Sequence, residues 1–108
     1  MRKARLEDMT RGWFIGNFEP VVLRTDAFEM GVKKYKAGEK EERHYHRVAS
    51  EVTLIVSGRV KMNGVTYVEG DIVALDPGEI TDFEAVTDAV TAVAKLPSLM
   101  GDKYLTDD

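Results

Sequence analysis

Two histidines and one glutamate carry the clearest chemical signal in this sequence. His44 and His46 are its only histidines, and Glu51 follows the second of them by five residues. Successive side chains of an extended strand point to opposite faces, so histidines separated by a single residue project from the same side. Two imidazoles and a carboxylate from a neighbouring strand form a ligand set that first-row divalent metals accept. We therefore predict a metal site at His44, His46 and Glu51.

Short strands and tight turns are expected to position these residues. The run 51–57 is rich in β-branched residues and stops at Gly58, and Asn63-Gly64 is a strong hairpin signal between two apolar runs. Other expected strands cover residues 21–23, 28–36, 60–62, 65–68, 72–75, 81–86 and 90–94. We expect residues 38–43 to be a polar connection, residues 2–9 to form at most a turn or two of helix, and the acidic tail after Pro97 to be loose. This rhythm is typical of an antiparallel sandwich or barrel.

Length and composition narrow the class of protein. The 108 residues suit one domain, 1–108, with a core from about 13 to 96 and short polar extensions at both ends. A net charge of −4 argues against a nucleic-acid partner, and the lack of cysteine excludes thiolate chemistry and disulfides. No apolar run approaches a membrane span and residues 1–10 do not resemble a signal peptide, so we expect a cytoplasmic protein without a membrane partner.

Five residues carry a resemblance to the cupins. Gly38, His44, His46, Glu51 and Gly58 occupy every fixed position of the first cupin motif, G-x5-H-x-H-x4-E-x6-G. The chain therefore resembles a small single-domain cupin. The resemblance implies an all-β double-stranded β-helix, a jelly-roll barrel, in which His44, His46 and Glu51 are metal ligands.

The second cupin motif, G-x5-P-x-G-x2-H-x3-N, is incomplete. Gly70 and Gly78 fit it, but Asp76 replaces its proline, Thr81 its histidine and Ala85 its asparagine. A threonine hydroxyl is a poor ligand because it is neutral and hard to deprotonate. The resemblance thus supplies three ligands, and we expect weaker metal retention than in a four-ligand site. Water or a substrate atom, hydrogen-bonded to the Thr81 hydroxyl, would fill the remaining position.

Several interpretations of these residues stay open. In one alternative no metal binds: both histidines lie on a polar inner face without an ion, and Glu51 pairs outside the barrel with Arg43 or Arg47. If a metal binds, Fe, Mn, Ni and Zn all suit two imidazoles and a carboxylate. Three function classes follow: a metal-dependent enzyme, a metal-free binder or isomerase of sugar-like molecules with a histidine as acid or base, and a non-catalytic ligand sensor. The substrate, the reaction and whether the protein is an enzyme are not specified.

The remaining side chains are given structural roles. We expect a homodimer that binds a small molecule, with residues 13–15 as a pocket wall or dimer contact. Aromatic side chains expected in the core or lining the barrel are Trp13, Phe14, Phe18, Tyr35, Tyr67 and Phe83. One charged segment is interpreted as a solvated surface rather than an anion site: Lys33, Lys34, Lys36, Glu39, Glu41 and Glu42.

Overall fold

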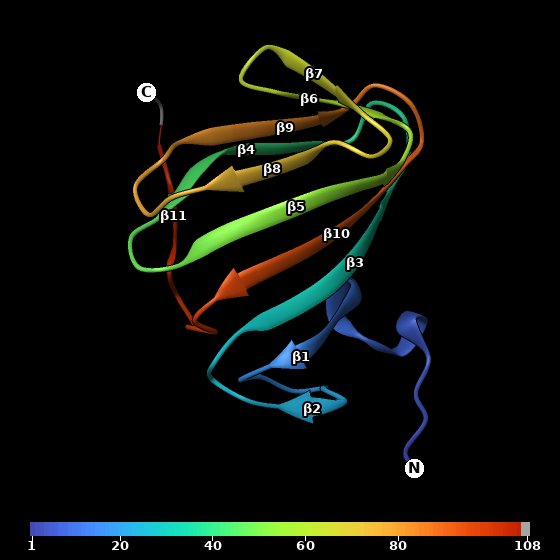
Figure 1. Cartoon of the computed structure of the whole chain (residues 1–108), viewed down its shortest axis with the longest axis vertical. Helices are drawn as coiled ribbons and strands as arrows, with labels where there is room; N and C mark the ends of the chain where they lie inside the picture. The colour runs from blue at the N-terminus through green and yellow to red at the C-terminus, as the bar shows by residue number, and fades with distance from the viewer. Residues whose placement is uncertain (107–108) are drawn as a thin grey trace.

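Antiparallel strands build most of this protein. The structure is a computed structural model that describes residues 1–106. Two single-turn 3-10 segments, η1 (Leu6–Asp8) and η2 (Thr10–Gly12), precede the strands (Figure 1). The strands are β1 (Trp13–Gly16), β2 (Leu23–Arg24), β3 (Glu29–Tyr35), β4 (Lys40–His46), β5 (Ser50–Ser57), β6 (Arg59–Met62), β7 (Val65–Val68), β8 (Ile72–Leu75), β9 (Thr81–Ala85), β10 (Ala89–Leu96) and β11 (Lys103–Leu105).

The strands form two sheets that face each other. One sheet has the order β2-β1-β3-β10-β5-β8 and the other the order β11-β4-β9-β6-β7. All neighbouring strands pair antiparallel except β1 and β2. The chain passes back and forth between the sheets (Figure 1), as in a jelly roll. The predicted all-β class is confirmed, although the two sheets are not joined into a closed barrel.

Alternation along β5 and β10 separates an inner from an outer face. On β5, Thr53 and Ile55 are buried while Val52, Leu54 and Val56 are exposed. The run of β-branched residues fits this pleated surface, and the register of β5 with β10 and β8 carries the same alternation across the sheet. The inner face therefore faces the second sheet, and the outer face is left apolar.

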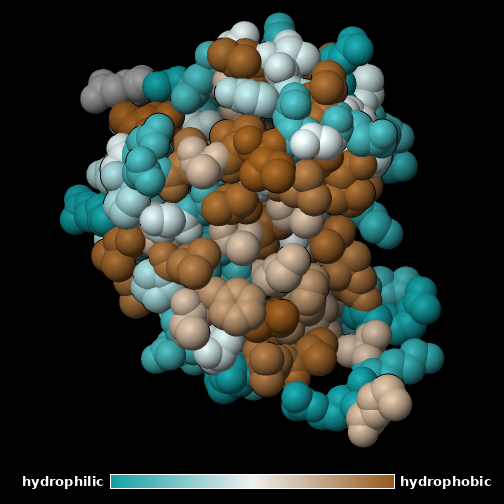
Figure 2. Space-filling view, in the orientation of Figure 1, coloured by the Kyte–Doolittle hydropathy of each residue, from teal (hydrophilic) through white to brown (hydrophobic). Residues whose placement is uncertain are grey.

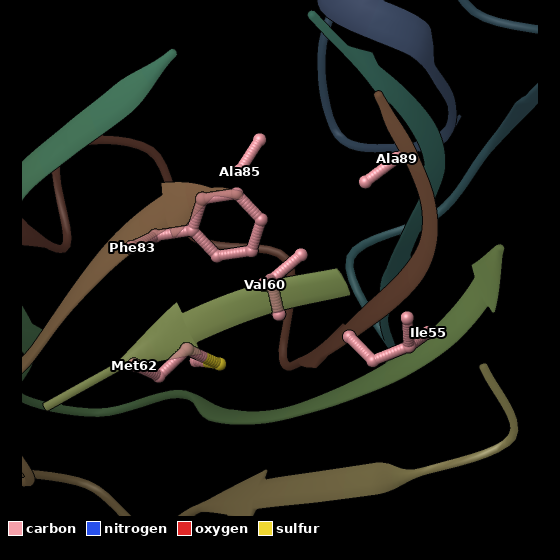
Figure 3. Packing of buried hydrophobic residues seen from close by; sticks show 6 residues of the cluster. All are labelled: Ile55, Val60, Met62, Phe83, Ala85 and Ala89. Atoms are coloured by element: carbon pink, nitrogen blue, oxygen red, sulfur yellow. The ribbon is translucent and has the colours of Figure 1, made fainter. Parts of the chain in front are cut away.

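The hydrophobic core fills one end of the space between the sheets. Its buried cluster consists of Ile55, Val60, Met62, Phe83, Ala85 and Ala89 (Figure 3). Gly58 closes this end with a φ of 87°, and a Cβ there would collide with the carbonyl oxygen of Asp88. The apolar cluster thus leaves the opposite end of the same space to polar side chains.

Residues 38–43, predicted as a polar connection, belong mostly to strand β4. Lys40 pairs with Glu84 and Glu41 with Phe83 of β9. Along this stretch the exposed side chains of Lys40 and Glu42 alternate with the half-buried ones of Glu41 and Arg43. Charged residues on both faces conceal the period-2 pattern by which a strand is normally found.

The tail after Pro97 is also more ordered than predicted. Strand β11 pairs with β4, and Tyr104 stacks on Tyr45 with ring centroids 5.4 Å apart. The guanidinium of Arg47 lies 4.2 Å from the Tyr104 ring centroid. The last two residues, Asp107 and Asp108, lie outside the described part of the chain. Among residues 1–106, no helix is long and apolar enough to cross a membrane.

Candidate functional site

Strand β4 directs both histidines into the space between the sheets. His44 and His46 are each 6% exposed. Their ring centroids lie 5.5 Å apart, and the rings meet edge to face at 77°. Tyr45, the residue between them, points the other way and stacks on Tyr104 of β11. The expectation that alternation places the two imidazoles on one side is therefore met.

A backbone carbonyl holds each imidazole through its Nδ1 atom. His44 Nδ1 lies 2.8 Å from the carbonyl oxygen of Glu42, and His46 Nδ1 lies 2.9 Å from that of Asp102. A carbonyl can only accept, so each Nδ1 carries the proton and donates it. Each Nε2 is then left with a lone pair, which is the form required of a metal ligand or a general base.

Glu51 approaches His46 from the adjoining strand β5. Its Oε1 lies 3.8 Å from His46 Nε2, too far for a hydrogen bond. His46 Nε2 is buried and has no hydrogen-bond partner among residues 1–106. The alternative pairing of Glu51 outside the barrel is wrong, because Arg43 pairs with Asp82 at 3.8 Å and Arg47 stacks on Tyr104.

Burial favours the uncharged form of all three side chains. It raises the pKa of Glu51, although Lys95 and His44 act in the opposite direction. Burial also lowers the pKa of both His44 and His46, against the hydrogen bonds that they donate to their backbone partners. Both histidines are therefore neutral near pH 7, and a cation beside Glu51 would favour its carboxylate form.

Two adjoining hollows meet at these residues. A cavity of about 120 Å³, which we call the inner cavity, is lined by His44, Glu51, Thr81 and Phe83 among others. His46 lines a neighbouring hollow of about 280 Å³ that opens beside Asp102. Among residues 1–106, no three His, Cys, Asp or Glu side chains are already grouped to hold a metal ion. The structure thus brings Glu51 close to His46 and into one cavity with His44, without a preformed three-ligand cluster.

Thr81, at the position of the missing motif histidine, lies beside His44. The two residues are cross-strand partners in the β4–β9 register, and Thr81 is buried. Its hydroxyl donates a hydrogen bond of 2.7 Å to the carbonyl oxygen of Asp82. The hydroxyl oxygen retains its ability to accept a hydrogen bond from a molecule in the inner cavity.

Two members of the charged segment predicted as a solvated surface lie inside. Lys33 and Glu41 both line the inner cavity, with Lys33 Nζ 3.7 Å from Glu41 Oε1. The Tyr35 hydroxyl donates a 2.8 Å hydrogen bond to the other oxygen of Glu41. The signal was available in the sequence, because Lys33 stands two residues before Tyr35 on one strand and so shares the face already assigned to Tyr35.

Asp102 was not singled out in the sequence, yet it organises the turn after His46. Its carboxylate accepts hydrogen bonds from the backbone N–H groups of Arg47 (3.0 Å), Val48 (3.2 Å) and Ala49 (2.9 Å). Burial by itself would raise the pKa of Asp102, but these three donors outweigh it and the net pKa is lowered. No motif or periodicity in the sequence predicts this role of Asp102, because the turn that it stabilises lies more than fifty residues earlier in the chain.

Comparisons with known proteins define the fold. No protein-family model matches this sequence, and no curated protein matches it. Among solved structures, an uncharacterized protein with a double-stranded β-helix domain from Klebsiella pneumoniae superposes with a TM-score of 0.74 at 20% identity, over 99% of this chain and 93% of that one.

Two longer proteins share the fold over part of their length. DMSP lyase DddQ from Ruegeria pomeroyi has a TM-score of 0.70 at 22% identity, covering 85% of this chain and 48% of its own. A sugar phosphate isomerase of the cupin superfamily from Silicibacter pomeroyi has a TM-score of 0.65 at 21% identity, covering 76% and 58%. This protein is therefore a double-stranded β-helix. A solved protein of the cupin superfamily shares this fold, which is the double-stranded β-helix that the first motif predicted.

Proposed function

We propose that His44, His46 and Glu51 hold one divalent metal ion beside a pocket for a small molecule. The observation that carries this proposal is the buried, unpartnered Nε2 of His46, 3.8 Å from a carboxylate oxygen of Glu51. An unsatisfied buried polar atom costs about 1–3 kcal/mol, so the arrangement favours a missing partner. Two metal–ligand bonds of roughly 2 Å span such a gap.

Three protein ligands would leave coordination positions open. A metal held in this way supplies a Lewis acid or a redox centre for a bound molecule. His44 and His46 serve as neutral ligands fixed by the carbonyls of Glu42 and Asp102, and Thr81 leaves the remaining side of the cavity to water or substrate. Solved proteins of the same fold include a DMSP lyase and a sugar phosphate isomerase, which supports a small-molecule reaction.

The first prediction concerns metal binding. Metal-free protein titrated with Fe(II), Mn(II), Ni(II) and Zn(II) should bind one equivalent of at least one of them, measured by calorimetry and by elemental analysis of untagged protein. His44→Ala or His46→Ala should abolish binding, because each removes one of three candidate ligands. Thr81→His should raise affinity by about tenfold or more, since it restores an imidazole at the motif position.

A matched control separates ligand loss from general damage. Glu39→Gln changes an exposed glutamate that lies between Gly38 and His44 of the same motif. It should leave metal affinity unchanged. If wild-type protein and Thr81→His bind none of the four metals, the metal site is wrong.

A metal-free acid–base site is the second candidate. It is favoured by the lack of a preformed three-ligand cluster in residues 1–106 and by the raised pKa of Glu51 next to a neutral His46. A carboxylic acid and an imidazole base 3.8 Å apart can relay a proton on a bound molecule. Turnover that survives exhaustive chelation would identify this candidate, whereas ligand binding without turnover would identify a non-catalytic binder.

A further inference from the structure

Cationic side chains outnumber carboxylates around the inner cavity. The charged side chains that line it are Arg11, Lys33, Lys95, Lys103, Glu41 and Glu51. The whole chain carries a net charge of −4, so this positive excess is a local feature. Clustered charges on low-dielectric walls attract counter-ions into a cavity.

Glu41 gathers two of the ammonium groups at the cavity wall. Lys33 Nζ and Lys103 Nζ each lie 3.7 Å from Glu41 Oε1, beyond hydrogen-bond distance. The Tyr35 hydroxyl fixes the other carboxylate oxygen at 2.8 Å. Lys33 is confined as well, with its side chain only 19% exposed. The two ammonium groups thus lie beside the same carboxylate oxygen, and their N–H donors can still turn toward another oxygen.

Trp13 positions a third ammonium group. Its ring lies 5.0 Å from Lys95 Nζ and 5.4 Å from Lys33 Nζ, within range of cation–π attraction to both. Trp13 also lines the inner cavity and is the only tryptophan of the chain. Its fluorescence therefore reports on charges that enter this space.

An unpartnered hydroxyl points to a ligand independently of the charges. Thr91 is fully buried, and its Oγ1 has no hydrogen-bond partner among residues 1–106. Thr91 lines the inner cavity and stands directly opposite Lys33 in the β10–β3 register. A buried hydroxyl is expected to be hydrogen-bonded, so its partner belongs in the cavity.

We propose that the inner cavity binds a small organic carboxylate, with Lys33, Lys103 and the Thr91 hydroxyl around its oxygens. Apolar walls from Met62, Phe83 and Val93 suit a short carbon skeleton, which inorganic phosphate lacks. A volume of about 120 Å³ suits a small acid of a few carbons. This inference rests on the small-molecule pocket of the proposed function and names its substrate class.

Fluorescence of Trp13 in chelator-treated, metal-free protein tests the proposal at low ionic strength. Malonate should produce a saturable change, whereas malonamide, a neutral molecule of similar shape, should not. Lys33→Met and Thr91→Val should each weaken malonate binding by about tenfold, because each removes one donor. Lys34→Met, which removes an exposed lysine from the opposite face of β3, should bind malonate as wild type does.

The outcomes separate the possible ligands. Equal binding of malonamide, or inorganic phosphate binding as tightly as malonate, would overturn the carboxylate assignment. So would a loss with Lys34→Met equal to that with Lys33→Met, since a nonspecific charge effect would explain both. Thr91→Val removes only a hydroxyl that makes no protein hydrogen bond, so it tests the site even if Lys33→Met fails to fold.

Malonate and metal titrations of the same protein distinguish this inference from the metal proposal. Malonate binding by a protein that takes up none of the four metals would support the carboxylate site and overturn the metal centre. Metal uptake by a protein that does not bind malonate, with or without the metal, would do the reverse.

Discussion

At the scale of single residues, charged groups inside the protein mark the site. Lys33 and Glu41 sit where apolar side chains would pack the two sheets together, and the ion pair they form is 3.7 Å long. Replacing such buried pairs by apolar residues is often neutral or stabilising, so stability gives little reason to keep them. Their position in the inner cavity beside His44 and Glu51 supplies that reason.

Tyr35→Phe tests how Glu41 is held. Burial alone would raise the pKa of Glu41, but Lys33 and the Tyr35 hydrogen bond outweigh it, and the pKa lies below its ordinary value of 4.5. A lowered carboxyl pKa gives stability that is present above pH 4.5 and lost as pH falls through the folded-state value. We expect Tyr35→Phe to cost about 1–2 kcal/mol of unfolding free energy at pH 7 and much less near pH 3.

Urea unfolding at several pH values measures this difference. Phenylalanine retains the ring packing of Tyr35 on Phe83, whose centroids are 4.5 Å apart, so the loss reports on the hydroxyl. Tyr67→Phe, on β7 and outside the inner cavity, is the matched control and should show no pH-dependent loss. A Tyr35→Phe loss of equal size at acid and neutral pH would contradict the assignment.

The metal-ligand candidates were predicted from the sequence, whereas the inward position of their charged neighbours was missed, although alternation from Tyr35 places Lys33 on the inner face. His44, His46 and Glu51 stand at fixed spacing, and alternation places both histidines inside. Lys33 and Glu41 look like ordinary surface charges in a sequence, because lysine and glutamate are rarely buried. Their partners become visible only when β3 and β4 are brought together by the fold.

At the scale of elements, β4 is the strand on which the site depends. It carries both histidines and Glu41, and it is flanked by β9 on one side and by β11 on the other. Its first half was missed because charges occupy both faces, and β11 was missed because three residues give too little periodicity to predict a strand. Strands with apolar alternation, such as β5, were predictable nearly to the residue.

Asp102→Ala tests the contribution of the C-terminal segment. The change leaves the N–H groups of Arg47, Val48 and Ala49 without their acceptor, so we expect a loss of about 2–3 kcal/mol in unfolding free energy. Alanine keeps the backbone carbonyl that accepts from His46 Nδ1, but without the carboxylate this carbonyl is no longer anchored to the turn after His46, so metal affinity should fall by about tenfold. Chemical denaturation and metal titration measure the two effects.

Asp71→Ala provides a control for the loss of a turn aspartate. Asp71 accepts a 2.8 Å hydrogen bond from the Val68 N–H in an exposed turn far along the chain from the site. Its replacement should cost less than about 1 kcal/mol and leave metal affinity unchanged. If Asp102→Ala behaves like Asp71→Ala, the C-terminal segment does not support the site.

At the scale of the whole molecule, residues 1–106 leave much of the outer face of the larger sheet, over β5 and β8, exposed. Large apolar side chains on β5 and β8 are 37–67% exposed there: Val52, Leu54, Val56 and Ile72. Brown, apolar side chains gather over these strands in Figure 2. Outward positions of the neighbouring β10 hold small or apolar residues, with Ala92 and Ala94 near the centre and no charge between residues 90 and 94. Exposed apolar patches of this kind are typical of association surfaces.

A second copy of the chain is the occupant that this face suits best, so we expect a homodimer. Face-to-face sheets approach to about 10 Å, which the central alanines permit. The part of this face formed by β5, β8 and the middle of β10 carries no charge, so two-fold pairing there brings no like charges together although each chain carries −4. Leu54→Glu should weaken the dimer by at least about 100-fold, because it buries a carboxylate at the interface. Sedimentation equilibrium measures this, with Val65→Glu, at a 51% exposed position of the other sheet, as the control that should remain dimeric. Wild-type protein that stays monomeric at high concentration would refute the dimer.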